Sequence, residues 1–170
     1  MNTAHRSVLA VEKLSRNEFQ PFGTAVLEPQ GSPTSSGEGF ECWFGCGTLN
    51  GLDFQLGQVI AQKPPGGITR MERHDHPELL LPISGAVVQV VAPRGDFADL
   101  EDCPDGAAAR AFLIEPGEAV LIDSGTWHAA AVPIDEKTLY YFAAVPDEPG
   151  TAGGAWMPFS GQQRFELSFD

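Results

Sequence analysis

The chain has 170 residues, 42% of them hydrophobic, which suits one domain with a substantial core. Its formal net charge of −13 argues against nucleic acid and anionic membrane surfaces as partners. The 19 glycines and 14 prolines favour many short strands joined by turns over a helical bundle.

The cysteines and the N-terminus indicate where the protein works. The three cysteines (Cys42, Cys46 and Cys103) cannot all pair and form no Cys-x-x-Cys, so cysteine-based zinc binding is not expected. Residues 1–13 lack the apolar core of a signal peptide, and no run is long enough to span a bilayer. We therefore expect a cytoplasmic protein in which 1–170 forms a single domain.

In the first third of the chain, short apolar runs alternate with turns. Ser15-Arg-Asn-Glu18 is a capping box, which predicts one short helical turn that ends at Pro21. Extended or alternating segments are predicted at 8–11, 23–27, 40–49 and 54–61, with a loop over 28–39 and a turn over 64–67.

The remainder of the chain continues in the same manner. Strands are predicted at 86–92, 112–114, 119–122, 127–132, 138–145 and 165–169, with a surface excursion over 93–110 and a Pro- and Gly-rich segment over 146–161. About nine short strands at regular spacing predict an all-β sandwich or barrel.

One stretch, 70–78, concentrates ionisable residues just before the apolar run 79–82. In an extended strand, alternate side chains share a face, which here would carry Arg70, Glu72, His74, His76, Glu78, Leu80 and Pro82. A face that changes from charged to apolar indicates the wall of a pocket. A second polar point follows at His128, and we predict that the fold brings it opposite Glu72, His74 and Glu78.

Structural interpretations of the same residues remain open. Glu72, His74 and Glu78 could form an exposed charged strand end, and His128 could be a buried histidine bonded to backbone. For His76, just before Pro77, we expect a loop residue that faces water.

The spacing of both stretches resembles the two motifs of the cupin superfamily. The first reads Gly66, five residues, Glu72-x-His74, three residues, Glu78, six residues, Gly85, with Glu72 in place of the usual first His. The second reads Gly117, five residues, Asp123-x-Gly125, two residues, His128, with Asp123 in place of Pro. The resemblance implies an all-β fold, a cupin-type double-stranded β-helix (jelly-roll barrel) with one or two short helices, and leaves the reaction open.

Within the cupins, the chain is similar to the ureidoglycolate lyase family. The similar stretches are 19–23, 72–74, 82–85, 110–114, 127–128 and 165–169. Two positions depart from the family: 75–78 carries more ionisable groups than expected, and Ala129 occupies a position where a second His could be expected. The likeness implies a carbon–nitrogen lyase that releases urea and glyoxylate from ureidoglycolate in allantoin and purine catabolism. The alternatives are another metal-dependent cupin enzyme (an isomerase or dioxygenase acting on a small hydroxy or keto acid) and a non-catalytic cupin that binds a small ligand.

The implied reaction needs a base, an acid and a cation. His74 and His128 are candidates for the proton transfers, and Glu72 or Glu78 could be the base or a metal ligand. The residues assigned to catalysis are therefore Glu72, His74 and His128. Arg70, Arg73 and Tyr141 are the residues selected to bind the small anionic substrate. Arg70 would lie on the same strand face as Glu72, whereas Arg73 would reach that face only if a bulge interrupts the strand.

A divalent metal ion is the alternative cation. Glu72, His74, Glu78 and His128 would supply mixed nitrogen and oxygen ligands, which suit Ni, Mn, Zn or Fe without choosing between them. The resemblance to cupins also implies a homodimer.

Overall fold

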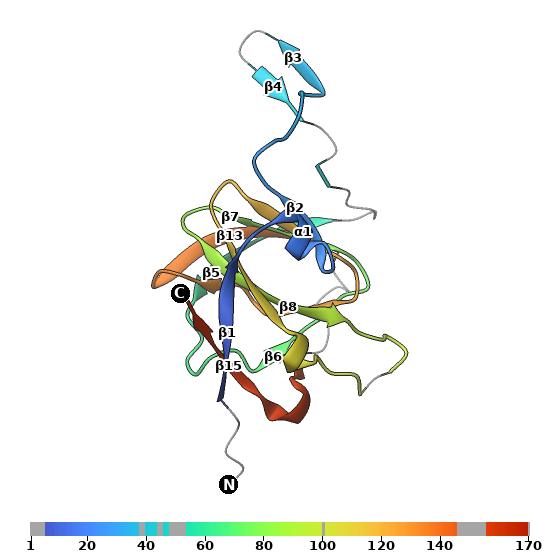
Figure 1. The fold of residues 1–170 in the computed structure, drawn as a ribbon, viewed down its shortest axis with the longest axis vertical. Coiled ribbons are helices and arrows are strands. Elements are labelled where there is room, and N and C mark those ends of the chain that lie inside the picture. The colour runs from blue at the N-terminus through green and yellow to red at the C-terminus, as the bar shows by residue number, and fades with distance from the viewer. Residues whose placement is uncertain are drawn as a thin grey trace.

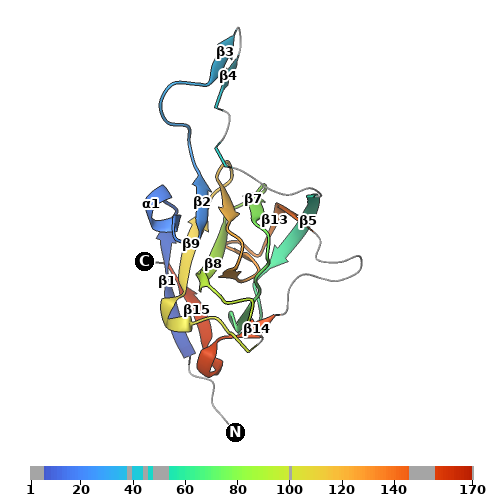
Figure 2. The same ribbon diagram turned by 90° about the vertical axis from the view of Figure 1, so that its right-hand side faces the viewer.

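The computed structural model describes residues 6–37, 40–43, 46–47, 54–99, 101–145 and 156–169. Two sheets dominate the fold, and they lie on opposite sides of the body in Figure 2. One has the order β11-β8-β9-β1-β15, with β12 also paired to β8, and the other has the order β2-β10-β7-β13-β5. The predicted all-β fold, with two sheets around a core and one short α-helix, is confirmed.

The first sheet, six-stranded, joins the two ends of the chain. Its strands are β1 (Arg6–Lys13), β8 (Val87–Arg94), β9 (Arg110–Ile114), β11 (Thr126–His128), β12 (Val132–Pro133) and β15 (Arg164–Ser168). β1 runs parallel to both β9 and β15. The predicted strand 127–132 is in fact two short strands, with a register shift between Thr126 and Trp127.

The second sheet is antiparallel throughout. Its strands are β2 (Gly23–Val26), β5 (Gln55–Gln62), β7 (Glu78–Pro82), β10 (Ala119–Ile122) and β13 (Lys137–Ala144). β13 lies between β7 and β5, which leaves β5 at the edge of the sheet.

Short elements complete the described chain. They are α1 (Arg16–Phe19), the 3₁₀ turns η1 (Gly106–Ala108) and η2 (Ser160–Gln162), the ribbon of β6 (Arg70–Met71) with β14 (Met157–Pro158), and the ribbon of β3 (Ser35–Gly37) with β4 (Phe40–Cys42). The β3–β4 ribbon projects away from the body (Figure 1). The predicted capping box is confirmed, since the Ser15 hydroxyl accepts a hydrogen bond from the Glu18 N–H at 3.2 Å. Much of the predicted segment 40–49 lies outside the described residues.

Two apolar clusters stabilise the body. The first lies between the sheets and contains Phe19, Leu80, Val91, Phe112 and Ile122, all at most 1% exposed. The second covers the other face of the six-stranded sheet and includes Val90, Trp127 and Phe165. Because side chains alternate along a strand, Val91 points between the sheets while Val90 points outward.

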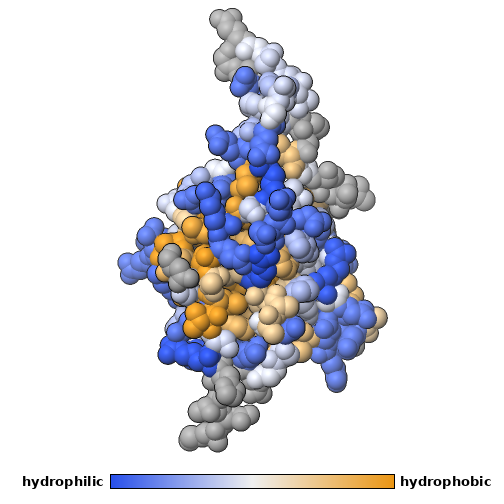
Figure 3. All heavy atoms as spheres, in the orientation of Figure 1, coloured by the Kyte–Doolittle hydropathy of each residue, from blue (hydrophilic) through white to orange (hydrophobic). Residues whose placement is uncertain are grey.

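The face shown in Figure 3 carries both hydrophilic and apolar residues, and the apolar ones gather near the C-terminal end of β15. Among the described residues, no helix combines the length and apolar character needed to cross a membrane.

Candidate active site

Backbone pairing brings the two sequence motifs together. Glu72 and His128 form an isolated antiparallel bridge in which each N–H donates to the other residue's carbonyl at 2.9 Å. The N–H of Gly125 in turn donates to the carbonyl of His74 at 2.7 Å. The prediction that His128 lies opposite Glu72 and His74 is thereby explained by the main chain itself.

The side chains of the four residues converge. The Nε2 atom of His74 lies 4.0 Å from Oε2 of Glu72 and 3.5 Å from Oε2 of Glu78. The same oxygen of Glu78 lies 3.8 Å from Nε2 of His128, and the rings of His74 and His128 have centroids 5.2 Å apart. This group is called the imidazole–carboxylate cluster below.

The predicted strand over 70–78 is wrong, although the convergence that it was meant to explain is real. β6 ends at Met71 and β7 begins at Glu78, and only the Glu72 bridge lies between them. A bend around 75–76, rather than strand alternation, turns His74 toward Glu78.

Burial and one hydrogen bond define the state of His128. Its side chain is 4% exposed, and this burial lowers its pKa although the charge of Glu78 opposes the shift. Nδ1 lies 2.9 Å from the carbonyl of Thr126, which can only accept, so Nδ1 carries the proton of the neutral ring. Nε2, which lies 3.8 Å from Oε2 of Glu78, is therefore the nitrogen that keeps its lone pair.

The charge of Glu78 is set by its neighbours. Burial alone would raise the pKa of Glu78, but the hydrogen bond with His74 and the nearby imidazoles of His128 and His76 outweigh burial and lower it. Glu78 is thus ionised at neutral pH.

These two lowered pKa values predict a loss of stability in acid. A group whose pKa is lower in the folded than in the unfolded state stabilises the fold above its unfolded pKa, and this contribution disappears as the pH falls. The loss begins below the ordinary pKa of 6.5 for His128 and of 4.5 for Glu78. We expect the urea midpoint of unfolding to decrease between about pH 7.5 and 5.5, and to decrease less in His128→Gln. A midpoint with the same pH dependence in both proteins would contradict the assignment to His128.

The cluster can hold a divalent cation. One ligand atom each from Glu72, His74 and His128 lies within 4.8 Å of the others. The Nε2 lone pair of His128 and the ionised Glu78 are both acceptors, and two acceptors 3.8 Å apart suit a cation between them. The carbonyl of Thr126 orients the ring of His128 in the way that an outer partner orients a metal-binding imidazole.

Arg70 does not join the cluster through any contact seen among the described residues. Its side chain is exposed, and its guanidinium lies 5.3 Å from the ring centroid of Trp156. The predicted role of Arg70 in substrate binding stays a prediction.

Arg73 is engaged elsewhere, on the opposite side from Glu72. Its guanidinium pairs with Asp102, donates to the carbonyl of Asp96 at 2.8 Å, and lies 4.5 Å from the ring centroid of Trp127. Arg73 therefore anchors the excursion 95–102 to the body, and the structure lends no support to its predicted contact with substrate.

We expect Arg73→Met to lower the free energy of unfolding by about 1–3 kcal/mol, because Asp102 and the carbonyl of Asp96 lose their donor. The KM of the predicted urea-releasing activity should change less than about twofold, because the guanidinium of Arg73 is engaged by Asp102 and Asp96 and does not help to bind the substrate. Urea denaturation and steady-state kinetics measure both. Arg94→Met is the control. Arg94 is 60% exposed and its ion pair with Asp123 is long, at 3.8 Å, so its loss should change the free energy of unfolding little. A tenfold rise in KM with unchanged stability would restore Arg73 as a substrate clamp.

Of the adjacent tyrosines, Tyr140 is the one that faces the cluster. It lies opposite Pro82 on β7, so it shares the face of Glu78 and Leu80. Burial, followed by the charges of Glu78 and Glu72, raises the pKa of Tyr140 to about 12. Its phenol therefore keeps its proton and can donate a hydrogen bond.

Tyr141 lies opposite Leu81, on the other face of the sheet, and its hydroxyl accepts from Nε2 of Gln58 at 3.3 Å. Geometry thus favours Tyr140 for the substrate-binding role predicted for Tyr141. That residues 78, 80 and 82 share one face of a strand could be predicted from the sequence. That β13 pairs with β7, and so brings Tyr140 to this face, could not.

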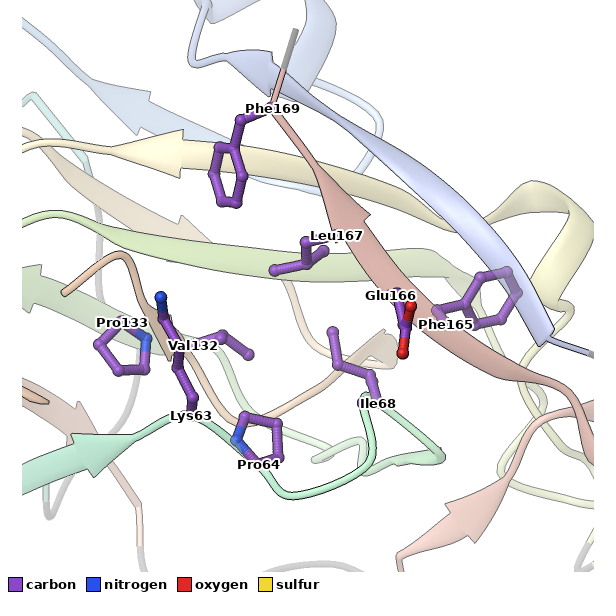
Figure 4. Close-up of a pocket in the computed structure, with 10 residues that line it drawn as sticks. Lys63, Pro64, Ile68, Val132, Pro133, Phe165, Glu166, Leu167 and Phe169 are labelled. Atoms are coloured by element: carbon purple, nitrogen blue, oxygen red, sulfur yellow. The ribbon is translucent and has the colours of Figure 1, made fainter. Parts of the chain in front are cut away.

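A hollow of about 200 Å³ lies elsewhere, as Figure 4 shows. Its lining includes Lys63, Ile68, Val132, Phe165 and Leu167. Most of these residues belong to, or pack against, the second apolar cluster, on the face of the six-stranded sheet that points away from the other sheet. His128 is instead paired with Val91, which belongs to the cluster between the sheets, so the hollow and His128 lie on different faces. None of the predicted site residues lines this hollow.

Comparisons with known proteins agree with the sequence resemblance. Residues 54–153 match the sequence model of a family described as ureidoglycolate lyase. The chain is 33% identical over 138 residues to a protein from Burkholderia cepacia named ureidoglycolate lyase, which covers 75% of this chain and 74% of that protein. A solved structure of RmlC from Streptococcus suis, in complex with dTDP-D-xylose, is similar at a TM-score of 0.41 with 10% identity, over 68% of this chain and 61% of that one. The family match and the identity over three quarters of the chain have one consequence: the protein belongs to the ureidoglycolate lyase family.

Proposed function

We propose that the protein is a ureidoglycolate lyase that releases urea and glyoxylate from ureidoglycolate at the imidazole–carboxylate cluster. Family membership supports the reaction. The Glu72–His128 bridge supports placing the reaction at this cluster, because it joins the two sequence motifs in the middle of the ionisable side chains.

The chemistry moves a single proton within the substrate. The hydroxyl loses its proton and becomes the aldehyde of glyoxylate, the carbon–nitrogen bond breaks, and its electron pair stays on the nitrogen. That nitrogen then takes up a proton and departs as urea, so protons and charge balance. One group that accepts the first proton and returns it is sufficient in principle.

Glu78 is suited to carry this proton. Its ionised carboxylate lies 3.5 Å from Nε2 of His74 and 3.8 Å from Nε2 of His128, so a proton can be shared among these three groups. Tyr140, which stays protonated, can donate to an oxygen of the substrate from the same face.

The anionic substrate needs a cation, and we propose that a divalent metal supplies it. The chain carries a net charge of −13, and among the described residues Arg70 lies over Trp156 while Arg73 pairs with Asp102. Glu72, His74 and His128 would hold the ion, with Glu78 beside them. When bound, the ion would anchor the carboxylate and hydroxyl of the substrate and stabilise negative charge on the oxygen.

The test is an assay of urea and glyoxylate with purified protein, before and after treatment with a chelator. We expect both products in equal amounts, loss of turnover on chelation, and recovery on addition of Ni, Mn, Zn or Fe. Binding of ureidoglycolate without release of urea would instead indicate a non-catalytic cupin, and turnover that resists complete metal removal would leave the lyase proposal standing without the metal.

We also propose that the enzyme works in the cytoplasm as a homodimer. Cys42, Cys46 and Cys103 are all unpaired, which suits a reducing compartment. The edge strand β5 carries no charged residue and exposes Leu56 and Ile60, so two negatively charged copies could meet there with little repulsion. Sedimentation equilibrium measures the mass of the assembly.

A further inference from the structure

We propose that Gln89 positions His128 for the reaction by fixing a β-bulge that follows His128 in the chain. This inference rests on the proposed lyase function and adds a positioning residue to its site. Gln89 lies in β8 with two valines on either side, yet it is polar and only 1% exposed. Burying an amide costs free energy unless the amide is hydrogen-bonded, so the hydrogen bonds of Gln89 indicate its role.

The pairing of β8 becomes irregular directly after His128. His128 is paired with Val91 of β8. The next pair joins Val132 to Val88 of the same strand. Between these two pairs, the segment 129–131 has three residues whereas β8 has two, so the segment forms a β-bulge. A bulge of this kind interrupts the ladder and re-aims the side chains beside it.

The side-chain amide of Gln89 holds the first residue of the bulge. In a hydrogen-bonded pair of a regular antiparallel ladder, each residue donates its N–H to the carbonyl of the other. Ala129 donates to the carbonyl of Val90 at 2.9 Å, but its own carbonyl accepts from Nε2 of Gln89 at 2.7 Å. The same nitrogen also donates to the carbonyl of Val90, at 3.2 Å. Gln89 therefore joins the two strands where the ladder is interrupted.

The place of the bulge decides which side chain faces the space between the sheets. Neighbouring side chains of a strand point to opposite faces, so a slip by one residue reverses them. His128 is paired with Val91 of the cluster between the sheets, whereas Ala129 belongs to the second apolar cluster, on the other face. A ladder that slipped by one residue would turn His128 away from Glu78. By fixing the bulge after His128, Gln89 keeps this imidazole in the imidazole–carboxylate cluster.

Regular backbone pairing supports His128 over only a short length. The ladder between β11 and β8 also shifts register between Thr126 and Trp127, so its regular part covers only Trp127 and His128. At the far end of the bulge, the backbone of Ala131 is hydrogen-bonded to the phenol of Tyr140, which belongs to the other sheet. The position of the bulge therefore affects His128 and also Tyr140, the residue proposed to donate to the substrate.

Two substitutions of Gln89 test this role. Gln89→Met fills nearly the same space but removes the donor, and Gln89→Asn keeps an amide that is shorter by one methylene and so lies farther from the carbonyl of Ala129. Val88→Ala is the matched control, because Val88 is also buried on β8 but belongs to the second apolar cluster. Urea release is measured per folded molecule, and amide hydrogen exchange is followed by NMR under native conditions.

We expect Gln89→Met to lower kcat/KM for urea release by about tenfold, the factor for one lost buried hydrogen bond, and Gln89→Asn to lower it less. In Gln89→Met, the N–H groups of His128 and Ala129 should exchange about tenfold faster relative to those of β10, which lies in the other sheet. In Val88→Ala this ratio should stay at the wild-type value, and kcat/KM per folded molecule should change less than about twofold.

An unchanged exchange ratio in Gln89→Met would overturn the proposal, because the amide would then not hold the bulge. Faster local exchange with wild-type kcat/KM would also overturn it, since His128 would then not depend on the bulge. An equal loss of kcat/KM in Val88→Ala would assign the effect to packing alone. If the wild-type protein released no urea, the lyase function would fail, yet the exchange ratio would still decide whether Gln89 fixes the bulge.

Discussion

His74→Ala is expected to lower kcat/KM for urea release by roughly 10²–10⁴-fold, the range for loss of a residue that takes part in proton transfer. The imidazole of His74 lies between the carboxylates of Glu72 and Glu78, at 4.0 and 3.5 Å. Its removal deletes a proton-carrying group and one of the candidate metal ligands, and leaves the two carboxylates to repel each other and the anionic substrate. Coupled assays of urea and glyoxylate measure the rate, and elemental analysis measures the bound metal.

Gln58→Ala serves as the control for this variant. Gln58 is exposed on β5 and donates to Tyr141 on the outer face of the sheet, so its loss should leave turnover within about twofold of the wild type. Wild-type turnover in His74→Ala would remove that residue from the mechanism. Loss of turnover with full metal content would assign His74 to proton transfer alone.

The spacing of residues carried most of the information about the site. The intervals that lead from Gly66 to Gly85 and from Gly117 to His128 depend on turns of fixed length, so they indicated the meeting of Glu72 with His128 before any pairing was known. Short sequence patterns were equally reliable where the interaction joins residues close in the chain, as in the cap that Ser15 provides for α1.

Strand parity failed where the chain bends. It placed Arg70 with Glu72 and His74, but β6 ends at Met71 and the alternation stops there. The partner of Arg73, Asp102, lies 29 residues away in a loop whose course no local pattern determines. The expectation that His76 faces water is wrong, because only 11% of its side chain is exposed. Its burial likewise follows from the stack on His74, which exists only once the chain has folded.

Phe112→Ala is expected to lower the free energy of unfolding by about 3–5 kcal/mol, the range for truncation of a buried aromatic ring. Phe112 is 0% exposed and lies in the cluster between the sheets. Its ring meets that of Phe19 edge-on at 5.2 Å and that of Phe22 at 5.9 Å, so the cavity would open where α1 packs onto β9. Because a domain of this kind is stable by only about 5–15 kcal/mol, the urea midpoint should drop sharply.

Phe169→Ala is the matched control, since the same atoms are removed from a side chain that is 55% exposed. Its free energy of unfolding should stay within about 0.5 kcal/mol of the wild type. Phe112 is not a member of the imidazole–carboxylate cluster, so the folded fraction of Phe112→Ala should retain wild-type KM at low temperature. Equal losses of stability in the two variants would show that the ring of Phe112 does not fill the space between the sheets, and a changed KM would show that this packing also positions His128 against Glu72.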